Sequence, residues 1–270
     1  MQTLILKHWP RLRPIFRRPL AIVVVLVALA LGIAANTAVV NLALTPLVDS
    51  LLGPHLDRLL MLSERQPTGG NSPLIYSPAD FDDLQKWNLS FAEVAAFAQK
   101  YTMLSEAGGS KFLATANVTA GFFNLLDAKP QVGRTFLRQE DQPGGEEVVV
   151  VSDRLWRQRF DSDPKIIEKS ITLDRRSYQV VGVMPADFQF PDQTDLWIPL
   201  ALGPREKADR TSFYLNVLAR LKPGVSVRQA QVELRGYLPR ITPQNALSLN
   251  GRNVLLDPVY DHLKSGLQAL

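Results

Sequence analysis

Two groups of carboxylates have the residue types and spacing that a metal site requires. They are Asp80, Asp82 and Asp83 in one group and Asp187, Asp192 and Asp195 in the other. Carboxylate oxygens bind hard cations such as Mg²⁺ and Ca²⁺. Acids in the first turn of a helix are also stabilised by the helix dipole, and the second group flanks an aromatic-proline segment typical of a loop. We therefore expect an acidic helical turn and a structured loop, and predict no metal-binding residues.

The residues that hydrolases and nucleotide-binding enzymes use are scarce in this chain. It has no cysteine and only three histidines, His8, His55 and His262. Ser152 with His262 and an aspartate would supply a catalytic triad, but no Gly-x-Ser-x-Gly motif surrounds the serine. Gly108-Gly109 and Gly144-Gly145 lack the Lys-Ser/Thr pair of a phosphate-binding loop. The sequence therefore predicts no catalytic residue, no cofactor and no enzymatic activity.

The net charge of +4 comes from one end of the chain. Residues 1–19 contain five Lys and Arg and no acid, which leaves 25 basic against 26 acidic residues in the rest of the 270. A nucleic-acid-binding protein needs its basic residues on a folded surface that faces the phosphates. The charge distribution therefore argues against a nucleic-acid partner.

The basic segment 1–19, which we expect to be a cytoplasmic tail, precedes an uncharged segment over residues 20–44. As a helix this segment would be about 37 Å long, enough to cross a hydrocarbon core of about 30 Å. Lys and Arg lie before it, and the charged residues in the next twenty positions are mainly acidic: Asp49, Asp57 and Glu64 against Arg58. By the positive-inside rule, the N-terminus is cytoplasmic and the remainder is outside the membrane.

The second half of the uncharged segment is rich in small and weakly polar residues, from Gly32 to Asn41. Such residues allow close packing against another membrane helix, but they are also found where a span ends at the interface. The small-x-small pattern at Ala28–Ala30 leaves a cleaved signal peptide as an alternative, although the apolar run exceeds the usual 7–15 residues. We expect a retained transmembrane helix.

The remaining residues predict one extracytoplasmic domain after a connecting segment. Residues 45–75 are interpreted as a stalk and loop, helical through residue 60 and turn-rich over 63–73. Residues 76–265 alternate short helices and strands without a repeat, so we expect an α+β, mixed α/β domain with two lobes. The predicted strands are 111–118, 148–151, a hairpin over 170–184, 214–221 and 253–256. Strand 214–221 is expected to have a mostly polar face formed by Tyr214, Asn216, Leu218 and Arg220. The predicted helices are 77–87, 120–126, 152–160 and 227–238, with Ser77, Thr119 and Ser152 as N-caps and a capping box at Ser226–Gln229.

Several segments in register resemble the MacB-like permeases, in particular the ADOP permease group. The similar segments are 28–38, 76–97, 121–136, 148–160, 178–185, 195–200 and 218–234. The resemblance covers about residues 20 to 265. It implies a MacB-like periplasmic core domain inserted between two membrane helices of an ABC-type permease in the bacterial inner membrane. Such a domain relays motion and supplies no catalytic residue, and its partners are the lipid bilayer, other permease helices and a separate cytoplasmic ABC ATPase.

The chain departs from the family pattern at a few turns and at its end. Asp127 and Glu168 replace glycines, and Asp174-Arg175 replaces the Asn-Gly pair of a tight hairpin. Residues 266–270 resemble the start of a lead-in to a second membrane helix, so we expect the chain to be the N-terminal part of a permease. The alternatives are a stand-alone anchored periplasmic binding or scaffold module and a cell-envelope enzyme.

The charge asymmetry around residues 20–44 makes the topology testable. Single cysteines at Gln2 and Gly145 should differ in reaction with an impermeant thiol reagent in intact cells, and only the second should be labelled. Equal labelling at both positions would contradict the predicted orientation.

Overall fold

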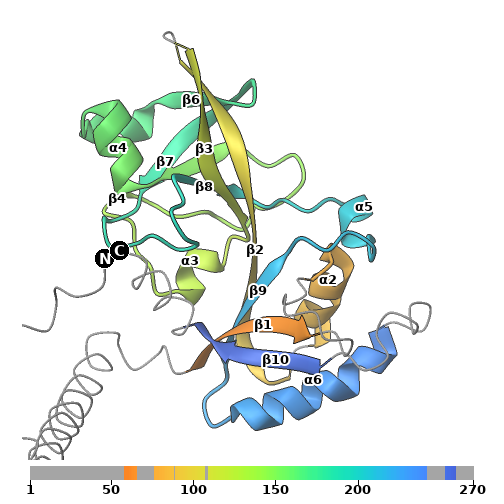
Figure 1. The fold of residues 1–270 in the computed structure, drawn as a ribbon. Coiled ribbons are helices and arrows are strands. Elements are labelled where there is room, and N and C mark those ends of the chain that lie inside the picture. Colours follow the sequence, from red (N-terminus) through yellow and green to blue (C-terminus); the bar gives the residue numbers. More distant parts are fainter. Residues whose placement is uncertain (1–57, 66–75, 88, 107–108, 242–252, 260–270) are drawn as a thin grey trace, which may run out of the picture. The chain divides into compact units, whose positions relative to one another are not determined.

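The computed structural model describes residues 58–65, 76–87, 89–106, 109–241 and 253–259 (Figure 1). The tail 1–19, the span 20–44, most of the stalk and residues 266–270 lie outside these ranges. Within the described ranges, no helix is long and apolar enough to cross a membrane.

Ten strands and six helices make up the described part of the chain. The strands are β1 (Leu59–Arg65), β2 (Phe91–Glu106), β3 (Gly109–Val118), β4 (Val132–Gly133), β5 (Val148–Val151), β6 (Ser170–Leu173), β7 (Arg176–Val183), β8 (Leu196–Pro199), β9 (Asn216–Leu221) and β10 (Asn253–Pro258). The helices are α2 (Pro78–Trp87), α3 (Phe122–Leu125), α4 (Asp153–Phe160), the 3-10 helix η2 (Pro164–Glu168), α5 (Pro204–Lys207) and α6 (Val227–Ile241).

All ten strands belong to one hydrogen-bonded sheet. Its order is β10-β1-β9-β2-β3-β8-β5-β7-β4, and β6 pairs with both β2 and β7. The second pairing of β6 closes a ring of six strands, β2-β3-β8-β5-β7-β6. Apolar side chains from all six strands form a common core with residues of α4 and η2: Leu104, Leu113, Val149, Leu155, Ile166, Leu173, Val180 and Leu196.

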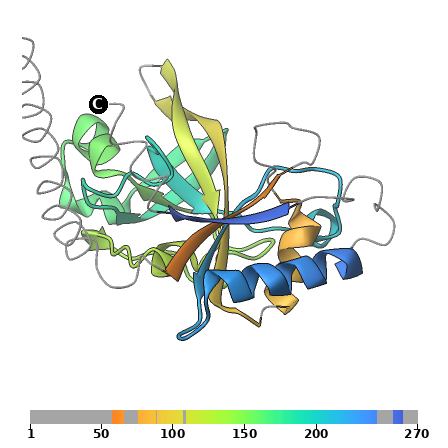
Figure 2. The ribbon, with the colours of Figure 1, turned by 60° about the horizontal axis from the view of Figure 1, so that its bottom comes forward.

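Strand β2 continues beyond the ring into a second part of the sheet. Its first half pairs with β9, which pairs with β1 and then β10. Helices α2 and α6 contribute Phe81, Leu84, Ala230 and Leu234 to one core with these strands. Figure 2 shows α6 running beside β10. The sequence predicted two lobes, and the structure has two helix-covered regions that share one strand.

A third core contains most of the buried aromatic residues. Phe97, Phe122, Phe123 and Trp197 gather here with the partly buried Phe188 and Phe190. Neighbouring rings in this cluster meet at centroid distances of 5.4–6.0 Å, mostly edge to face or tilted. Such contacts add to the stabilisation from apolar burial. The cluster holds α3 and the 185–191 loop against the sheet.

Several elements form as the local sequence predicts. The four valines of β5 are completely buried, and Ser152 caps α4 by accepting a hydrogen bond from the Leu155 amide at 3.1 Å. Ser226 and Gln229 form the predicted capping box of α6, in which Gln229 Oε1 accepts from the Ser226 amide at 2.8 Å. These signals depend on neighbouring residues only, which is why the sequence reveals them.

Other predictions were wrong where distant strands decide the structure. The helical stalk does not extend to residue 60, and the turn-rich loop does not begin at 63, because Leu59–Arg65 is a strand between β9 and β10. Thr119 does not cap α3, whose N-cap is Gly121; its hydroxyl instead accepts a hydrogen bond from the Ala96 amide at 3.1 Å. The predicted polar face of β9 contains the fully buried Leu218.

Gly145 is a poorer labelling position than the sequence suggests. A Cβ added there would lie 2.8 Å from the carbonyl oxygens of Gln139 and Glu140. A cysteine at this position would therefore displace the backbone of the loop. The adjacent Glu146 is exposed and takes its place in the topology experiment.

The hairpin between β6 and β7 keeps a tight two-residue turn despite lacking Asn-Gly. Asp174 and Arg175 both have positive φ, at 48° and 68°. Strand β2 supports the turn, because the Met103 amide donates to Asp174 Oδ1 and the Asp174 amide donates to the Met103 carbonyl, both at 2.9 Å. A contact with β2 therefore supports Asp174 in this turn, whereas no hydrogen bond or ion pair within the described ranges supports Arg175.

Replacing Arg175 with glycine should stabilise the protein. The left-handed conformation costs a non-glycine residue about 1–2 kcal/mol, and a glycine avoids this cost. Glycine also makes the unfolded chain more flexible, which offsets about 0.5–1 kcal/mol of the stabilisation. We expect Arg175→Gly to raise the free energy of unfolding by about 0.5–1 kcal/mol in urea denaturation. The matched Ser177→Gly change in β7 should lower it, and a loss from Arg175→Gly would contradict the argument.

Candidate functional site

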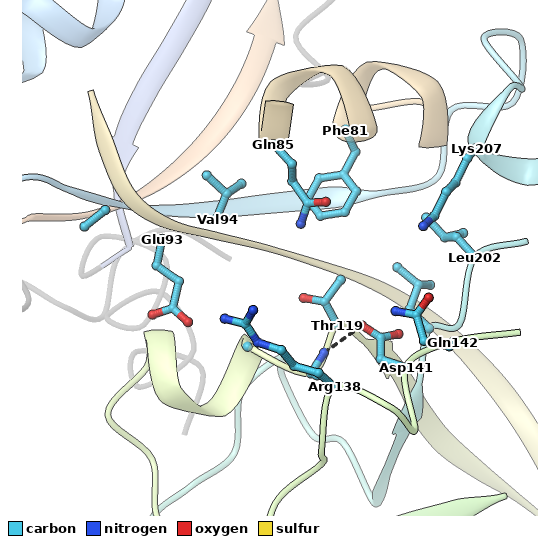
Figure 3. A pocket seen from close by; sticks show the side chains of 14 residues that line it. Phe81, Gln85, Glu93, Val94, Thr119, Arg138, Asp141, Gln142, Leu202 and Lys207 are labelled. Carbon is cyan, nitrogen blue, oxygen red and sulfur yellow. Dashed lines mark hydrogen bonds between the residues drawn. The ribbon is translucent and has the colours of Figure 1, made fainter. Parts of the chain in front are cut away.

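A polar cleft of about 380 Å³ lies between α2, the start of β2 and three loops (Figure 3). Charged and amide side chains converge on it from separate segments: Gln85, Glu93, Arg138, Asp141, Gln142 and Lys207. Apolar side chains complete the lining: Phe81, Val94, Leu200 and Leu202. Its volume lies within the range of small-ligand sites, but its lining is more polar than is usual for them.

Helix α2 forms one wall of the cleft. An N-cap residue and an arginine from a distant segment fix its position. Ser77 accepts a hydrogen bond from the Asp80 amide at 3.1 Å, which starts the helix. Arg210 then binds Asp80 at 3.1 Å and Asp83 at 2.6 Å from the chain that precedes β9. Phe81 is buried beneath the helix, and the exposed Gln85 lies one turn further along it at the cleft.

Asp141 ties the opposite wall together. Its two carboxylate oxygens accept hydrogen bonds from the Ala120 amide at 2.8 Å and the Ala201 amide at 2.7 Å. It thus joins the turn before α3 to the segment after β8. Burial raises the pKa of the Asp141 carboxyl above its ordinary value, although these backbone donors and Lys207 oppose the shift.

The preceding Glu140 fixes the same loop from within. Its side chain is buried, forms a bidentate pair with Arg134 at 2.6 and 3.0 Å, and accepts from the Leu137 amide at 2.7 Å. Charge-assisted hydrogen bonds of this geometry are strong and directional. Glu140 and Asp141 lie between Arg138 and Gln142 in the sequence, and they therefore hold the loop that carries these two residues.

Three charged groups in the cleft have no close partner within the described residues: Glu93, Arg138 and Lys207. Glu93 is half-buried and lies over Gly121, where an added Cβ would meet Glu93 Oε1 at 3.0 Å. Burial raises the pKa of the Glu93 carboxyl, and the more distant charges of Arg220 and Arg138 oppose the shift. Figure 3 shows Arg138 reaching into the cleft and Lys207 pointing toward it from α5.

The acids of the two carboxylate groups are paired with basic side chains or exposed. In the first, Asp82 pairs with Lys86, and the other two acids pair with Arg210. In the second, Asp195 binds Arg154 at 2.8 Å and accepts from the Ala114 amide at 3.1 Å, while Asp187 and Asp192 are exposed. No group of three or more metal-ligating side chains occurs among the described residues.

The residues considered for a catalytic triad and a phosphate-binding loop have structural roles or lie outside the described residues. Ser152 caps α4, and His262 lies outside the described residues, as does Gly108. Gly109 is the first residue of β3 and Gly144 lies in a turn before β5, and both have positive φ, at 130° and 77°.

Sequence reasoning missed the residues that meet in the cleft. Glu93, Arg138 and Lys207 are far apart in the chain, and only Glu93 lies within one of the family-like segments, 76–97. Glu140 and Asp141 follow another of these segments, 121–136. Their role is to hold the loop that carries Arg138.

The fold and the cleft define a mixed α/β domain built on one extended sheet, with a polar site beside helix α2. The chain belongs to the family of MacB-like periplasmic core domains, because the sequence model of that family matches residues 23–237. No curated protein sequence matches the chain significantly.

Solved structures of low sequence identity share the fold. A domain of a Porphyromonas gingivalis protein described as a permease is 16% identical with a TM-score of 0.58, covering 76% of this chain and 92% of that one. The periplasmic region of MacB from Actinobacillus actinomycetemcomitans is 13% identical with a TM-score of 0.58, covering 80% and 95%. The extracellular domain of the noncanonical ABC-type transporter YknZ from Gram-positive bacteria is 14% identical with a TM-score of 0.54, covering 73% and 99%.

Substitution of Asp141 should loosen the cleft wall. In Asp141→Asn, the remaining side-chain oxygen can accept from one of the two backbone amides, but the new side-chain NH2 group faces the other amide, and both are donors. We therefore expect the free energy of unfolding to fall by about 1–3 kcal/mol. Urea denaturation measures this loss, and the exposed Asp187→Asn should change little.

The same variant should alter the pH dependence of stability. Because the pKa of Asp141 is raised, the folded state keeps this proton to a higher pH than the unfolded state, and stability falls as the pH rises from 3.8 through the raised value. The difference between wild type and Asp141→Asn should therefore be smaller at pH 7 than at pH 4. A larger difference at pH 7 would contradict the assigned direction.

Proposed function

We propose that this chain is a non-catalytic permease component of an ABC-type export or mechanotransmission system. The observation that carries the proposal is the family match over residues 23–237, which includes most of the predicted span as well as the folded domain. Two of the solved relatives are described as parts of MacB and of an ABC-type transporter. The proposed role is to relay motion from the membrane to the outer domain.

In this proposal, residues 20–44 cross the inner membrane once, with residues 1–19 in the cytoplasm and residues 76–265 in the periplasm. The energy comes from a separate cytoplasmic ABC ATPase, and the membrane partners are lipids and other permease helices. A partner can bias the outer domain only through contacts that differ between its conformations. The cleft beside α2 is the place where we expect such conformations to differ, because its walls come from separate segments joined by few bonds.

A second candidate function is a membrane-anchored periplasmic binding or scaffold module that acts without an ATPase. The cleft favours this candidate, because it has the volume and converging polar groups of a binding site. The two functions differ in whether the outer domain responds to nucleotide.

The decisive experiment measures a distance across the domain in its native membrane. Spin labels at the exposed Lys129 and Arg205 report on the segment after α3 and on α5. In inverted membrane vesicles of the source organism, where the partners are retained, the relay proposal predicts a different label distance with ATP than without nucleotide.

A matched pair of labels at Lys100 and Arg176 controls for global effects, because both residues lie on strands of the closed ring. Their distance should stay the same with and without ATP. A nucleotide-independent distance between Lys129 and Arg205 would contradict the relay and favour the binding module.

A further inference from the structure

We infer that the cleft beside α2 binds a small zwitterionic ligand of the size of a short free peptide, with its ammonium at Glu93 and its carboxylate at Arg138 and Lys207. The inference goes beyond the proposed relay and does not depend on it. It rests on four features of the cleft: its charge balance, the lack of internal partners, its preformed walls and its apolar patch.

The formal charges of the cleft sum to zero, which favours a ligand of low net charge. Two acids and two bases line the cleft: Glu93, Asp141, Arg138 and Lys207. Both carboxylate oxygens of Asp141 already accept hydrogen bonds, from the Ala120 and Ala201 amides, so we assign Asp141 to the cleft wall and not to the ligand. One carboxylate and two cations then remain to meet a ligand, and they match a molecule that carries one positive and one negative group.

The remaining charged groups are available because they do not pair with one another at close range. In the described part of the chain, no hydrogen bond or ion pair engages the side chains of Glu93, Arg138 or Lys207, whereas the Arg134 and Arg210 side chains both pair with acids. Glu93 is half-buried over Gly121, so its carboxylate has lost solvent without gaining a donor. A ligand ammonium would supply that donor.

The walls are already in place before a ligand arrives. Helix α2 is fixed by Arg210, and the loop of Arg138 is fixed by Glu140 and Asp141. A preformed site loses less conformational entropy on binding than a mobile one. The glutamines at 85 and 142 add amide groups that can pair with peptide bonds.

The apolar lining fits one aliphatic side chain rather than a larger hydrophobic molecule. Phe81 and Leu202 are buried, and Val94 and Leu200 are partly exposed at the cleft surface. Polar groups account for the rest of the lining. We therefore expect a dipeptide with one aliphatic residue to be a better ligand than a lipid chain.

The test uses the purified 270-residue chain and three forms of one dipeptide: Ala-Leu, N-acetyl-Ala-Leu and Ala-Leu amide. Isothermal titration calorimetry should detect binding of free Ala-Leu, and each blocked form should bind roughly tenfold more weakly, because it lacks one charge-assisted contact. Absence of heat with all three forms, or equal binding by all three, would overturn the inference.

Variants assign the two ends of the ligand. Glu93→Gln should remove the preference for the free amine but keep the preference for the free carboxylate, and Arg138→Gln should do the reverse. Lys207→Gln should act like Arg138→Gln, while the exposed control variants Arg205→Gln and Glu168→Gln should bind like wild type.

If Glu93→Gln and Arg138→Gln still discriminate between the three forms of the dipeptide, the ligand binds elsewhere and the inference is wrong. Binding with no ATP-dependent distance change would leave this inference intact and reject only the relay.

Discussion

Strand β2 is the constraint on which the rest of the structure depends. Its first half pairs with β9 and its second half pairs with β3 and β6, so it belongs to both the closed ring and the β9-β1-β10 part of the sheet. A hydrogen-bonded strand cannot bend sharply without losing backbone bonds. The two regions that it joins therefore share one rigid element, and movement between them must occur in the loops beside it.

The cleft lies beside the start of this strand. Glu93 and Val94 come from β2 itself, whereas the loop that carries Arg138 is held by the side chains of Asp141 and Glu140. Side-chain clips of this kind hold a loop in one position, yet only a few bonds must change to release it. The same residues thus shape a binding site and supply the place where a mechanical input can change it.

The sequence predicted the elements that depend on neighbouring residues. The valine run of β5, the Ser152 cap and the Ser226–Gln229 capping box all formed as expected. The family was also identifiable, because segments spread over the whole domain resembled it in order.

Features that depend on distant partners could not be predicted in this way. The Leu59–Arg65 strand has a leucine pattern that suits a helix equally well, and only its position between β9 and β10 makes it a strand. Arg138 and Glu93 became candidate binding residues only because folding brings their segments to one cleft. The tight Asp174-Arg175 turn likewise required Met103 from β2.

Hydrogen exchange of individual backbone amides in the native membrane complex is the most direct test of this account. The central claim is that β2 stays fixed while the wall held by Asp141 moves. On addition of ATP, the Ala120 and Ala201 amides, which donate to Asp141, should change their exchange rates, and the β2 amides of Ala95 to Thr102 should not. Unchanged rates at Ala120 and Ala201, or a change along β2, would contradict the claim.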